Sequence, residues 1–264
     1  MTELGPETFL PLAERLADVS ADIVRRYFRA GASDLKVEAK ADESPVTVAD
    51  RSAEAAMRAL IEEAYPDHGI LGEEFPFVRT GAEYAWVLDP IDGTKAFVTG
   101  MPVFGTLIAL MHNGRPILGI INQPVTRERW VGVAGRRTTL NGRPIATSST
   151  ARLADAAHYA THPGMFAQGD DWTKVQSLLA RVKSSRYGGD CYAYGLLAAG
   201  FIDLVTEARL QIYDFMALIP VIEGAGGMIT DWNGGTLTRD SDGHVLAAAN
   251  AACHAAALEL LRDA

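Results

Sequence analysis

The chain has 264 residues, of which 48% are hydrophobic and 22% are charged, so it can bury a sizeable core and is not expected to be disordered. Its formal net charge of −9 argues against nucleic acid or an anionic membrane surface as a partner. No apolar run is long enough for a membrane helix, two cysteines are too few for a disulfide scaffold, and the first residues lack a signal-peptide pattern. We therefore expect a cytoplasmic protein that binds neither membrane nor nucleic acid.

The first elements expected along the chain are helices. Residues 6–29 carry apolar side chains at helical spacing, which predicts one helix. A second helix is expected between Pro45 and Pro66. Thr47 and Asp50 fit the capping box of this second helix, and we expect them to be structural.

Strands follow, and two of them end in acidic residues. The segments GILGEEF (69–75) and YAWVLDP (84–90) are both typical of short strands. The next segment alternates strand and turn, with strong hairpin turns at 112–114 and 141–142. Helices followed by such a meander predict an α+β half over about residues 1–150.

Helices and strands alternate in the second half, over about residues 151–264. We expect helices at 170–182, 191–200, 213–227 and 252–261, and strands at 201–208 and 228–232. This alternation predicts an α/β half, so the fold class is a mixture of α+β and α/β. The sequence has no internal repeat, and the two halves are expected to form a single domain.

The main chemical signal is WVLDPIDGTKAF (86–97), in which a strand that is expected to be buried ends in Asp89 and Asp92. A buried carboxylate is costly unless it is paired or binds a cation. By itself the pair fits a strand-ending turn, because Asp-Pro and Asp-Gly are common turn dipeptides. The spacing around a proline also directs both carboxylates the same way, with the Ile91 carbonyl between them, which suits a hard cation such as Mg²⁺.

Gly93 and Thr94 come next, at the start of a short expected helix. Thr94 alone fits a helix N-cap. Free backbone amides at a helix start also bind anions, and Gly93 lets an anion approach the backbone. A cation site beside an anion site predicts a phosphate group that bridges the two.

Other acids have a structural interpretation beside a functional one. Glu74 is expected to be a solvated residue at a strand end. Glu73 follows Gly72 and would point toward Asp89 if the two strands are neighbours. Asp214 fits the first turn of a helix, where the helix dipole stabilises an acid. The histidines and cysteines show no metal-ligand spacing, and no G-x-G-x-x-G, Walker or G-x-S-x-G pattern is present.

Three separated motifs resemble the inositol monophosphatase superfamily of magnesium-dependent phosphatases. They are GEE (72–74), DPIDGT (89–94) followed by Phe97, and YD (213–214) before EGAGG (223–227). The motifs occur in the family's order, and the order of elements agrees over essentially the whole chain. The resemblance implies a layered αβαβα sandwich of the inositol monophosphatase and fructose-1,6-bisphosphatase type, one phosphatase domain, and a homodimer.

The resemblance also implies which residues bind the metal ions. Glu73, Asp89 and the Ile91 carbonyl would hold one Mg²⁺ ion. Asp89, Asp92 and Asp214 would hold a second ion, and Glu73 would reach a third, so that two to three ions bind per site. Mn²⁺ is the alternative ion.

The implied reaction is hydrolysis of a small phosphate monoester by metal-activated water. Glu73 and Thr94 would orient that water and accept its proton, and Asp92 belongs to the same catalytic group. Gly93 and Thr94 would hold phosphate oxygens. A non-catalytic phosphate-binding protein and a purely structural acid cluster are the alternatives of other classes.

Two positions depart from the inositol-specific members of the superfamily. Those members have Thr-Asn after the DGT and Trp-Asp in the last motif, whereas this chain has Lys95-Ala96 and Tyr213-Asp214. The stretches DGTKAFVTGMPVFGTLIAL and RYGGDCYAYGLLAAG are similar instead to the histidinol-phosphatases. By this resemblance Arg186 and Asp214 would contact substrate. Lys95 is also shared with the 3′-phosphoadenosine bisphosphatases, so it does not decide between that class and the histidinol-phosphatases.

A charge argument favours the same substrate. Histidinol phosphate carries an amine and an imidazole, and Asp190 and Glu207 lie where the resemblance places the organic end of the substrate. A carboxylate about 4 Å from an ammonium group gains roughly 1–4 kcal/mol, a contribution that inositol hydroxyls lack. The structural alternatives are an exposed strand-end acid for Glu207 and an N-cap of the helix from Cys191 for Asp190.

The sequence therefore predicts hydrolysis of L-histidinol phosphate to L-histidinol and phosphate in histidine biosynthesis. The same chemistry on inositol 1-phosphate or on 3′-phosphoadenosine 5′-phosphate is the alternative. The residues expected to bind the substrate are Asp92, Gly93, Thr94, Lys95, Arg186, Asp190, Glu207 and Asp214.

Overall fold

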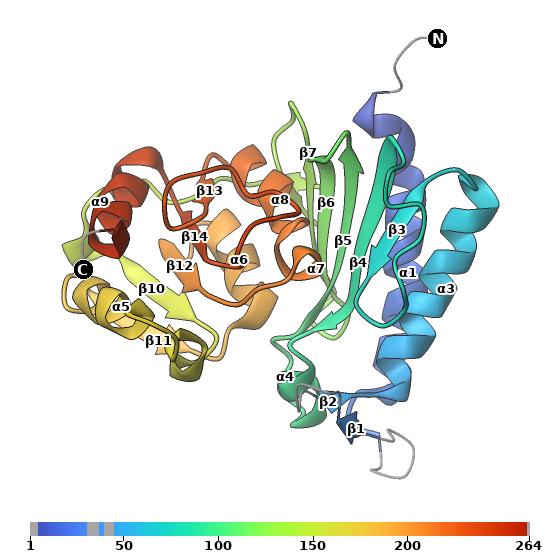
Figure 1. Cartoon of the computed structure of the whole chain (residues 1–264), viewed down its shortest axis with the longest axis horizontal. Coiled ribbons are helices and arrows are strands. Elements are labelled where there is room, and N and C mark those ends of the chain that lie inside the picture. Colours follow the sequence, from blue (N-terminus) through green and yellow to red (C-terminus); the bar gives the residue numbers. More distant parts are fainter. Residues whose placement is uncertain (1–4, 31–36, 40–44, 263–264) are drawn as a thin grey trace.

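A computed structural model of the chain describes residues 5–30, 37–39 and 45–262 (Figure 1). The helices of these residues are η1 (Pro6–Phe9), α1 (Leu10–Tyr27), α3 (Val48–Ala64), α4 (Thr94–Val98), η2 (Leu153–Asp155), η3 (Pro163–Phe166), α5 (Asp171–Leu179), α6 (Asp190–Ala198), α7 (Ile212–Phe215), α8 (Leu218–Gly224) and α9 (Ala251–Arg262). The strands are β1 (Glu38–Ala39), β2 (Pro45–Val46), β3 (Gly69–Gly72), β4 (Tyr84–Asp92), β5 (Gly105–His112), β6 (Arg115–Gln123), β7 (Glu128–Val133), β8 (Thr139–Leu140), β9 (Arg143–Pro144), β10 (Ala157–Ala160), β11 (Ser184–Tyr187), β12 (Leu204–Glu207), β13 (Met228–Thr230) and β14 (Val245–Ala248).

The first sheet has the strand order β3-β4-β5-β6-β7-β8-β9, in which β3 and β4 are parallel and the other neighbours are antiparallel. Helices α1 and α3 cover its outer face (Figure 1). Successive side chains of a strand point to opposite faces. Trp86 and Leu88 of β4 therefore pack with Leu16 of α1 and Met57 of α3, whereas Val87 points into the core between the two sheets.

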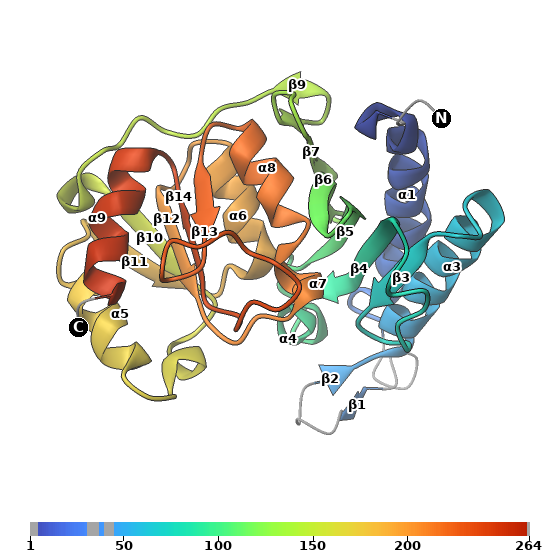
Figure 2. The same cartoon turned by 45° about the horizontal axis from the view of Figure 1, so that its top comes forward.

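The second sheet has the order β11-β10-β12-β14-β13, with β10 parallel to β11 and β12 and with β14 antiparallel to its two neighbours. Helices α6 and α8 lie between the sheets (Figure 2), and Tyr194 of α6 shares one core with Leu107 and Val205. Helices α5 and α9 cover the far face of the second sheet, where Leu178 packs with Leu246. The molecule is therefore layered helix, sheet, helix, sheet, helix.

This layering confirms the expected αβαβα sandwich. The first sheet is built from residues 69–144 and the second from residues 157–248. The division of a single domain into halves at about residue 150 stays a prediction. Within the described residues, every helix is too short or too polar to cross a membrane.

Local signals predicted several elements correctly. Both hairpin turns are confirmed, since Asn113 and Asn141 have φ angles of 49° and 50° and each precedes a glycine that also has a positive φ. The capping box of α3 is confirmed as well, because Thr47 and Asp50 exchange the expected hydrogen bonds. The first helix was expected to end near residue 29, and the structure shows that α1 ends at Tyr27.

The structure also differs from the expectation at particular elements. The single helix expected at 213–227 is split into α7 and α8, because Pro220 has no N–H to donate to the Met216 carbonyl in a continuous helix. Strands β10, β11 and β14 were not expected. The sequence of β11 is SSRY, and all of its residues are exposed, so it carries no alternating apolar pattern.

Candidate active site

The two aspartates of the DPIDGT motif lie in β4, on either side of a β-bulge. Asp89 pairs with Leu107 of β5 and Asp92 pairs with Gly105, so β4 has one residue more than β5 between these pairs. Positions i and i+3 of a regular strand face opposite sides of the sheet, and the extra residue lets both carboxylates face the same side. The strand-ending turn considered from the sequence is therefore a bulge within the strand.

A buried hydroxyl group holds this bulge. Thr106 Oγ1 donates a hydrogen bond to the Pro90 carbonyl oxygen (2.9 Å) and lies 2.8 Å from Ser20 Oγ of α1. The Thr106 and Ser20 side chains are fully buried. Proline is tolerated at a bulge because the residues there are not fully paired in the ladder.

Four carboxylates converge at the end of β4. Ligand oxygens of Asp89, Asp92 and Asp214 lie within 4.8 Å of one another. Asp214 comes from α7, where its Oδ2 also accepts a hydrogen bond from the Gln211 N–H (2.6 Å), so it caps the helix as well. Glu73 directly follows Gly72 of β3, which pairs with Leu88 of β4, so Glu73 lies beside Asp89 and its charge raises the pKa of Asp89. We call Glu73, Asp89, Asp92 and Asp214 the acidic cluster.

The ionised form of the acidic cluster is electrostatically unfavourable without a cation. Burial raises the pKa of Asp89 well above its ordinary value, and repulsion from Glu73 and Asp92 raises it further. Burial also raises the pKa of Asp92 to about 6 against the hydrogen bonds from Cys191, and it raises the pKa of Asp214. No ion pair between described residues involves Asp89, Asp92 or Asp214. A set of like-charged oxygen ligands fits a hard divalent cation such as Mg²⁺.

The residues between Asp89 and the start of α4 are joined by short contacts. The Ile91 N–H donates to Asp89 Oδ1 (3.0 Å), and Thr94 Oγ1 donates to the Ile91 carbonyl oxygen (3.1 Å). Gly93 is the N-cap of α4 and has a φ of 84°, a left-handed conformation that favours glycine. The interpretation of Thr94 as an N-cap is therefore wrong: it is the first helical residue, and its hydroxyl turns back to the bulge.

Asp190 approaches this region from the start of α6. It is the first helical residue and not the N-cap considered from the sequence, and its φ of 43° lies in the left-handed region, which aspartate tolerates better than most residues. A Cβ atom on Gly93 would lie 2.9 Å from the Asp190 Cβ, so the two segments touch. Burial, with repulsion from Asp92, raises the pKa of Asp190 to about 7 against the effect of Lys95. The next N–H, that of Cys191, donates to Asp92 Oδ2 (2.6 Å).

Glu207 is buried at the end of β12 and is only 4% exposed. The interpretation of Glu207 as an exposed strand-end acid is therefore wrong. Its carboxylate accepts hydrogen bonds from the Thr161 N–H (3.0 Å), from the Thr161 hydroxyl and from Tyr194 Oη (3.0 Å). Burial raises the pKa of Glu207 to about 8, and the charges of Asp92 and Asp190 add to the shift. Glu207 is thus within electrostatic reach of the site, with its oxygens already bonded to protein.

Lys95 and Arg186 are both exposed but differ in their surroundings. Lys95 lies on α4, and its charge lowers the pKa of Asp190, which places it within electrostatic reach of that carboxylate. Arg186 lies on β11, the edge strand of the second sheet. Within the described residues, no hydrogen bond or ion pair joins Arg186 to the acidic cluster.

Two acids of α3, Asp50 and Glu54, are buried, and neither was expected from the sequence to take part in the site. Asp50 caps α3, but its Oδ1 is buried without a hydrogen-bond partner among the described residues. Burial raises the pKa of Asp50 to about 6, and repulsion from Glu73 adds to the shift, so Asp50 lies near the acidic cluster. Glu54 is fully buried one turn later. The available signal was the i, i+4 spacing of two acids on the apolar face of a helix, where unpaired charges are rare.

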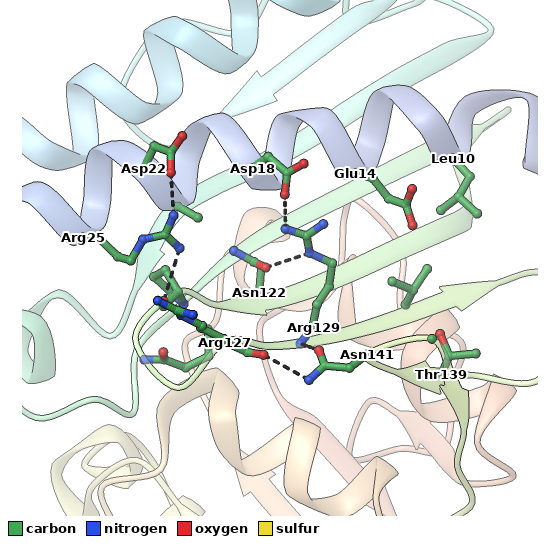
Figure 3. A pocket seen from close by; sticks show the side chains of 15 residues that line it. Leu10, Glu14, Asp18, Asp22, Arg25, Asn122, Arg127, Arg129, Thr139 and Asn141 are labelled. Carbon is green, nitrogen blue, oxygen red and sulfur yellow. Dashed lines mark hydrogen bonds and ion pairs between the residues drawn. The ribbon is translucent and has the colours of Figure 1, made fainter.

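A cavity of about 870 Å³ lies elsewhere, between α1 and strands β6 to β8 (Figure 3). Its charged side chains largely pair with each other: Arg129 with Asp18 (2.6 Å) and Arg25 with Asp22 (2.5 Å). No residue of the acidic cluster lines it. The size of a cavity is therefore not what identifies the site in this molecule.

Known proteins are similar to this chain in sequence and in fold. The model of the inositol monophosphatase family matches residues 6–264. Bifunctional phosphatase IMPL2, chloroplastic, of Arabidopsis thaliana is 48% identical, over 98% of this chain and 76% of the relative. A histidinol-phosphatase of Chlorobaculum parvum is 35% identical, over 90% of this chain and 91% of the relative. The solved structure of an inositol monophosphatase from Zymomonas mobilis has a TM-score of 0.89 and 47% identity, over 98% of this chain and 100% of that chain. The chain is therefore a phosphatase of the inositol monophosphatase family.

Proposed function

We propose that the chain is a Mg²⁺-dependent phosphomonoesterase that hydrolyses L-histidinol phosphate to L-histidinol and phosphate, as a step of histidine biosynthesis. The main support is the convergence of Asp89, Asp92 and Asp214, whose ligand oxygens lie within 4.8 Å of one another. Glu73 and the Ile91 carbonyl oxygen complete the proposed ligands. Two or three Mg²⁺ ions, or Mn²⁺ in their place, would activate a water molecule as Lewis acids and neutralise charge on the phosphate.

The residues of the chain have separate tasks in this proposal. Thr94 Oγ1 and Glu73 orient the attacking water, and the Glu73 carboxylate accepts the proton that the water loses. Gly93 and Thr94 bind phosphate oxygens, and the lack of a side chain at Gly93 allows a close approach to the backbone. The Cys191 N–H holds Asp92 Oδ2 (2.6 Å), so the Asp92 carboxylate keeps a fixed orientation.

The choice of histidinol phosphate is supported by sequence and by charge. A relative 35% identical to this chain has the name histidinol-phosphatase. The amine and imidazole of that substrate are able to be cationic, and Asp190 offers them a half-buried carboxylate beside Asp92. Glu207 would act through its charge, because its oxygens already accept hydrogen bonds. Direct contacts of Arg186 and Asp214 with the substrate stay predictions.

An inositol phosphate is the second candidate substrate. The solved inositol monophosphatase from Zymomonas mobilis is 47% identical to this chain, a likeness closer than that to the Chlorobaculum parvum histidinol-phosphatase. 3′-Phosphoadenosine 5′-phosphate is the further alternative, because Lys95 is shared with enzymes of that class. Non-catalytic phosphate binding is the alternative of another class.

A substrate panel tests the proposal. Phosphate release is measured from histidinol phosphate, myo-inositol 1-phosphate and 3′-phosphoadenosine 5′-phosphate, each with Mg²⁺ and with a chelator. We expect release to need Mg²⁺, and kcat/KM to favour histidinol phosphate over the inositol ester roughly 5- to 150-fold, the equivalent of about 1–3 kcal/mol for a carboxylate left without a partner. Faster hydrolysis of the inositol ester would make that the substrate, and no hydrolysis of any ester would favour a binding protein.

The cellular setting and the assembly are also proposals. Cytoplasmic localisation rests on the sequence alone, and the Arabidopsis thaliana relative has "chloroplastic" in its name. A homodimer is expected from the family resemblance. Gel filtration combined with light scattering measures the mass in solution and tests the dimer directly.

A further inference from the structure

We propose that Glu54 is a positioning residue for Glu73: it binds the backbone directly after Glu73 and so keeps that carboxylate in the acidic cluster. The inference rests on the proposed function, in which Glu73 is a metal ligand and the proton acceptor. Glu54 itself touches no substrate and no reacting atom in this proposal. Its effect on the reaction would pass entirely through Glu73.

The contacts of Glu54 all lead to the turn that follows β3. Its Oε2 accepts a hydrogen bond from the Glu74 N–H (2.7 Å), and its Oε1 accepts one from the Phe75 N–H (3.3 Å). Oε1 also accepts from Arg58 Nε (2.7 Å), and the other end of that guanidinium donates from Nη2 to the Phe75 carbonyl oxygen (3.0 Å). Glu54 and Arg58 of α3 thus bind both the N–H and the carbonyl oxygen of Phe75.

The turn is shaped to accept this carboxylate. A Cβ atom on Gly72 would lie 2.0 Å from Glu54 Oε1, so the absence of a side chain there provides the space that Glu54 occupies. The Glu73 N–H donates to the Leu88 carbonyl oxygen of β4 (3.2 Å). Glu73 is therefore fixed by β4 at its own amide and by Glu54 at the amide that follows it.

The position of Glu73 matters because Gly72 pairs with Leu88, which places Glu73 beside Asp89 within the acidic cluster. The Glu54 side chain is fully buried and the Arg58 side chain is 12% exposed. A buried acid and base add little stability compared with apolar side chains of similar size, so stability alone does not account for this pair. The pair does fix the backbone conformation from which Glu73 projects, and residues that orient metal ligands commonly act in this way.

The test is Glu54→Gln, with Mn²⁺ binding followed by electron paramagnetic resonance in addition to kinetics. The amide keeps the size of the side chain but replaces one of the two acceptor oxygens, each of which accepts one or two of the three hydrogen bonds, by a donor. We expect the Mn²⁺ dissociation constant to rise about 10- to 100-fold and kcat to fall by a similar factor, as when the residues behind metal ligands are changed. In a Glu73→Gln background the same change should alter either quantity less than about twofold, because coupled residues are not additive.

Asp203→Asn is the matched control. Asp203 is also a buried acid that accepts a backbone hydrogen bond, from the Ala157 N–H (2.7 Å), but it lies next to β12 of the second sheet. Its hydrogen bonds among the described residues join it to Ser148, Ala157 and Ala249, and none reaches the turn after β3. We expect this variant to lower the melting temperature without metal and to leave Mn²⁺ affinity unchanged. A Glu54→Gln variant that behaves like this control would overturn the positioning role and make Glu54 structural.

Two further results keep the inference separate from the proposed function. If Glu54→Gln does not fold, Arg58→Gln replaces it, with a smaller expected loss of Mn²⁺ affinity; unchanged affinity would again overturn the inference. If the wild type hydrolyses none of the tested esters but its Mn²⁺ affinity still depends on Glu54 only when Glu73 is present, the positioning role stands and the proposed reaction fails.

Discussion

At the scale of single residues, the structure brings together three acids that the sequence analysis named, and their binding of a metal ion stays a prediction. Asp89, Asp92 and Asp214 are separated in the sequence by up to 125 residues (214 − 89), and the structure brings their oxygens within 4.8 Å of one another. The motif residues could be named because DPIDGT and YD resemble motifs of the inositol monophosphatase superfamily; by itself each acid also fits a turn or a helix start. Glu54 was not named, although it lies four residues after Asp50 on the apolar face of α3, because its hydrogen bonds to the Glu74 and Phe75 N–H groups exist only in the folded structure.

Asp92→Asn should nearly abolish turnover while the fold survives. The change removes one charge from the acidic cluster, so it weakens cation binding, and it relieves repulsion among the acids, so the metal-free protein should not lose stability. The Cys191 N–H can still donate to the amide oxygen of the new side chain. A rate above about a tenth of wild type at saturating Mg²⁺ would argue against a two-metal site.

Thr94→Ala should lower kcat by roughly 100-fold and leave Mn²⁺ affinity almost unchanged. The hydroxyl is proposed to orient the attacking water, a contribution of the size that general acid–base groups make. It donates to the Ile91 carbonyl oxygen (3.1 Å) in the structure and caps nothing, so the helix start should survive its loss. A normal kcat with a raised KM would show that Thr94 only binds phosphate.

At the scale of elements, those defined by neighbouring residues could be predicted, whereas those defined by pairing with a distant strand could not. The hairpin turns depend on adjacent Asn and Gly residues and were predicted correctly, as was the capping box of α3. Strand β11 depends on pairing with β10 and has four exposed residues, so no periodic pattern indicated it. The bulge in β4 was missed because it is defined by the register with β5, which the sequence of β4 alone does not contain.

Thr106→Val should destabilise the bulge, and with it the site. The substitution keeps the shape of the side chain but leaves the Pro90 carbonyl oxygen without its bond (2.9 Å), which should cost about 1–3 kcal/mol of unfolding free energy. Urea unfolding measures this cost, and we expect Mn²⁺ affinity to fall as well.

Thr206→Val is the matched control for this prediction. Thr206 is also fully buried in a strand, but its hydroxyl has no hydrogen-bond partner among the described residues. Its replacement by valine should therefore change stability little or raise it. Equal losses in the two variants would show that the Thr106 hydroxyl has no special part in holding the bulge.

The whole molecule should lose stability in acid partly through His158, which lies in β10 of the second sheet. In the sequence, His158 is more than 50 residues from every proposed metal ligand. The side chain is fully buried, and burial lowers the pKa of His158 from 6.5 to about 4. The unfolded chain therefore takes up the proton first, so stability present above pH 6.5 is lost as the pH falls toward 4.

Comparison with His158→Gln isolates this contribution, because the other titrating groups remain the same. Between pH 7 and pH 5, in the presence of a chelator, the wild type should lose about 2 kcal/mol more unfolding free energy than the variant. The variant is expected to start from a lower stability at pH 7. Parallel pH profiles for the two proteins would contradict a neutral buried His158.

Cation binding should stabilise the whole molecule, because the acidic cluster joins elements that are distant in the sequence. Asp89 and Asp92 come from β4 of the first sheet, whereas Asp214 comes from α7, which leads into the helix layer between the sheets. A cation that binds only the folded chain adds about 2.7 kcal/mol at 100 times its dissociation constant. The melting temperature should therefore rise with Mg²⁺ and fall again with a chelator.

Asp214→Asn separates this stabilisation from a general effect of salt. The variant loses one ligand charge but keeps an oxygen that can accept from the Gln211 N–H, so α7 should remain capped. Its melting temperature should respond to Mg²⁺ much less than that of the wild type, and its metal-free stability should be similar or higher because repulsion with Asp92 is removed. If neither protein responds to Mg²⁺ or to chelator, the acids form a structural cluster, and the proposed hydrolysis would need another source of charge neutralisation.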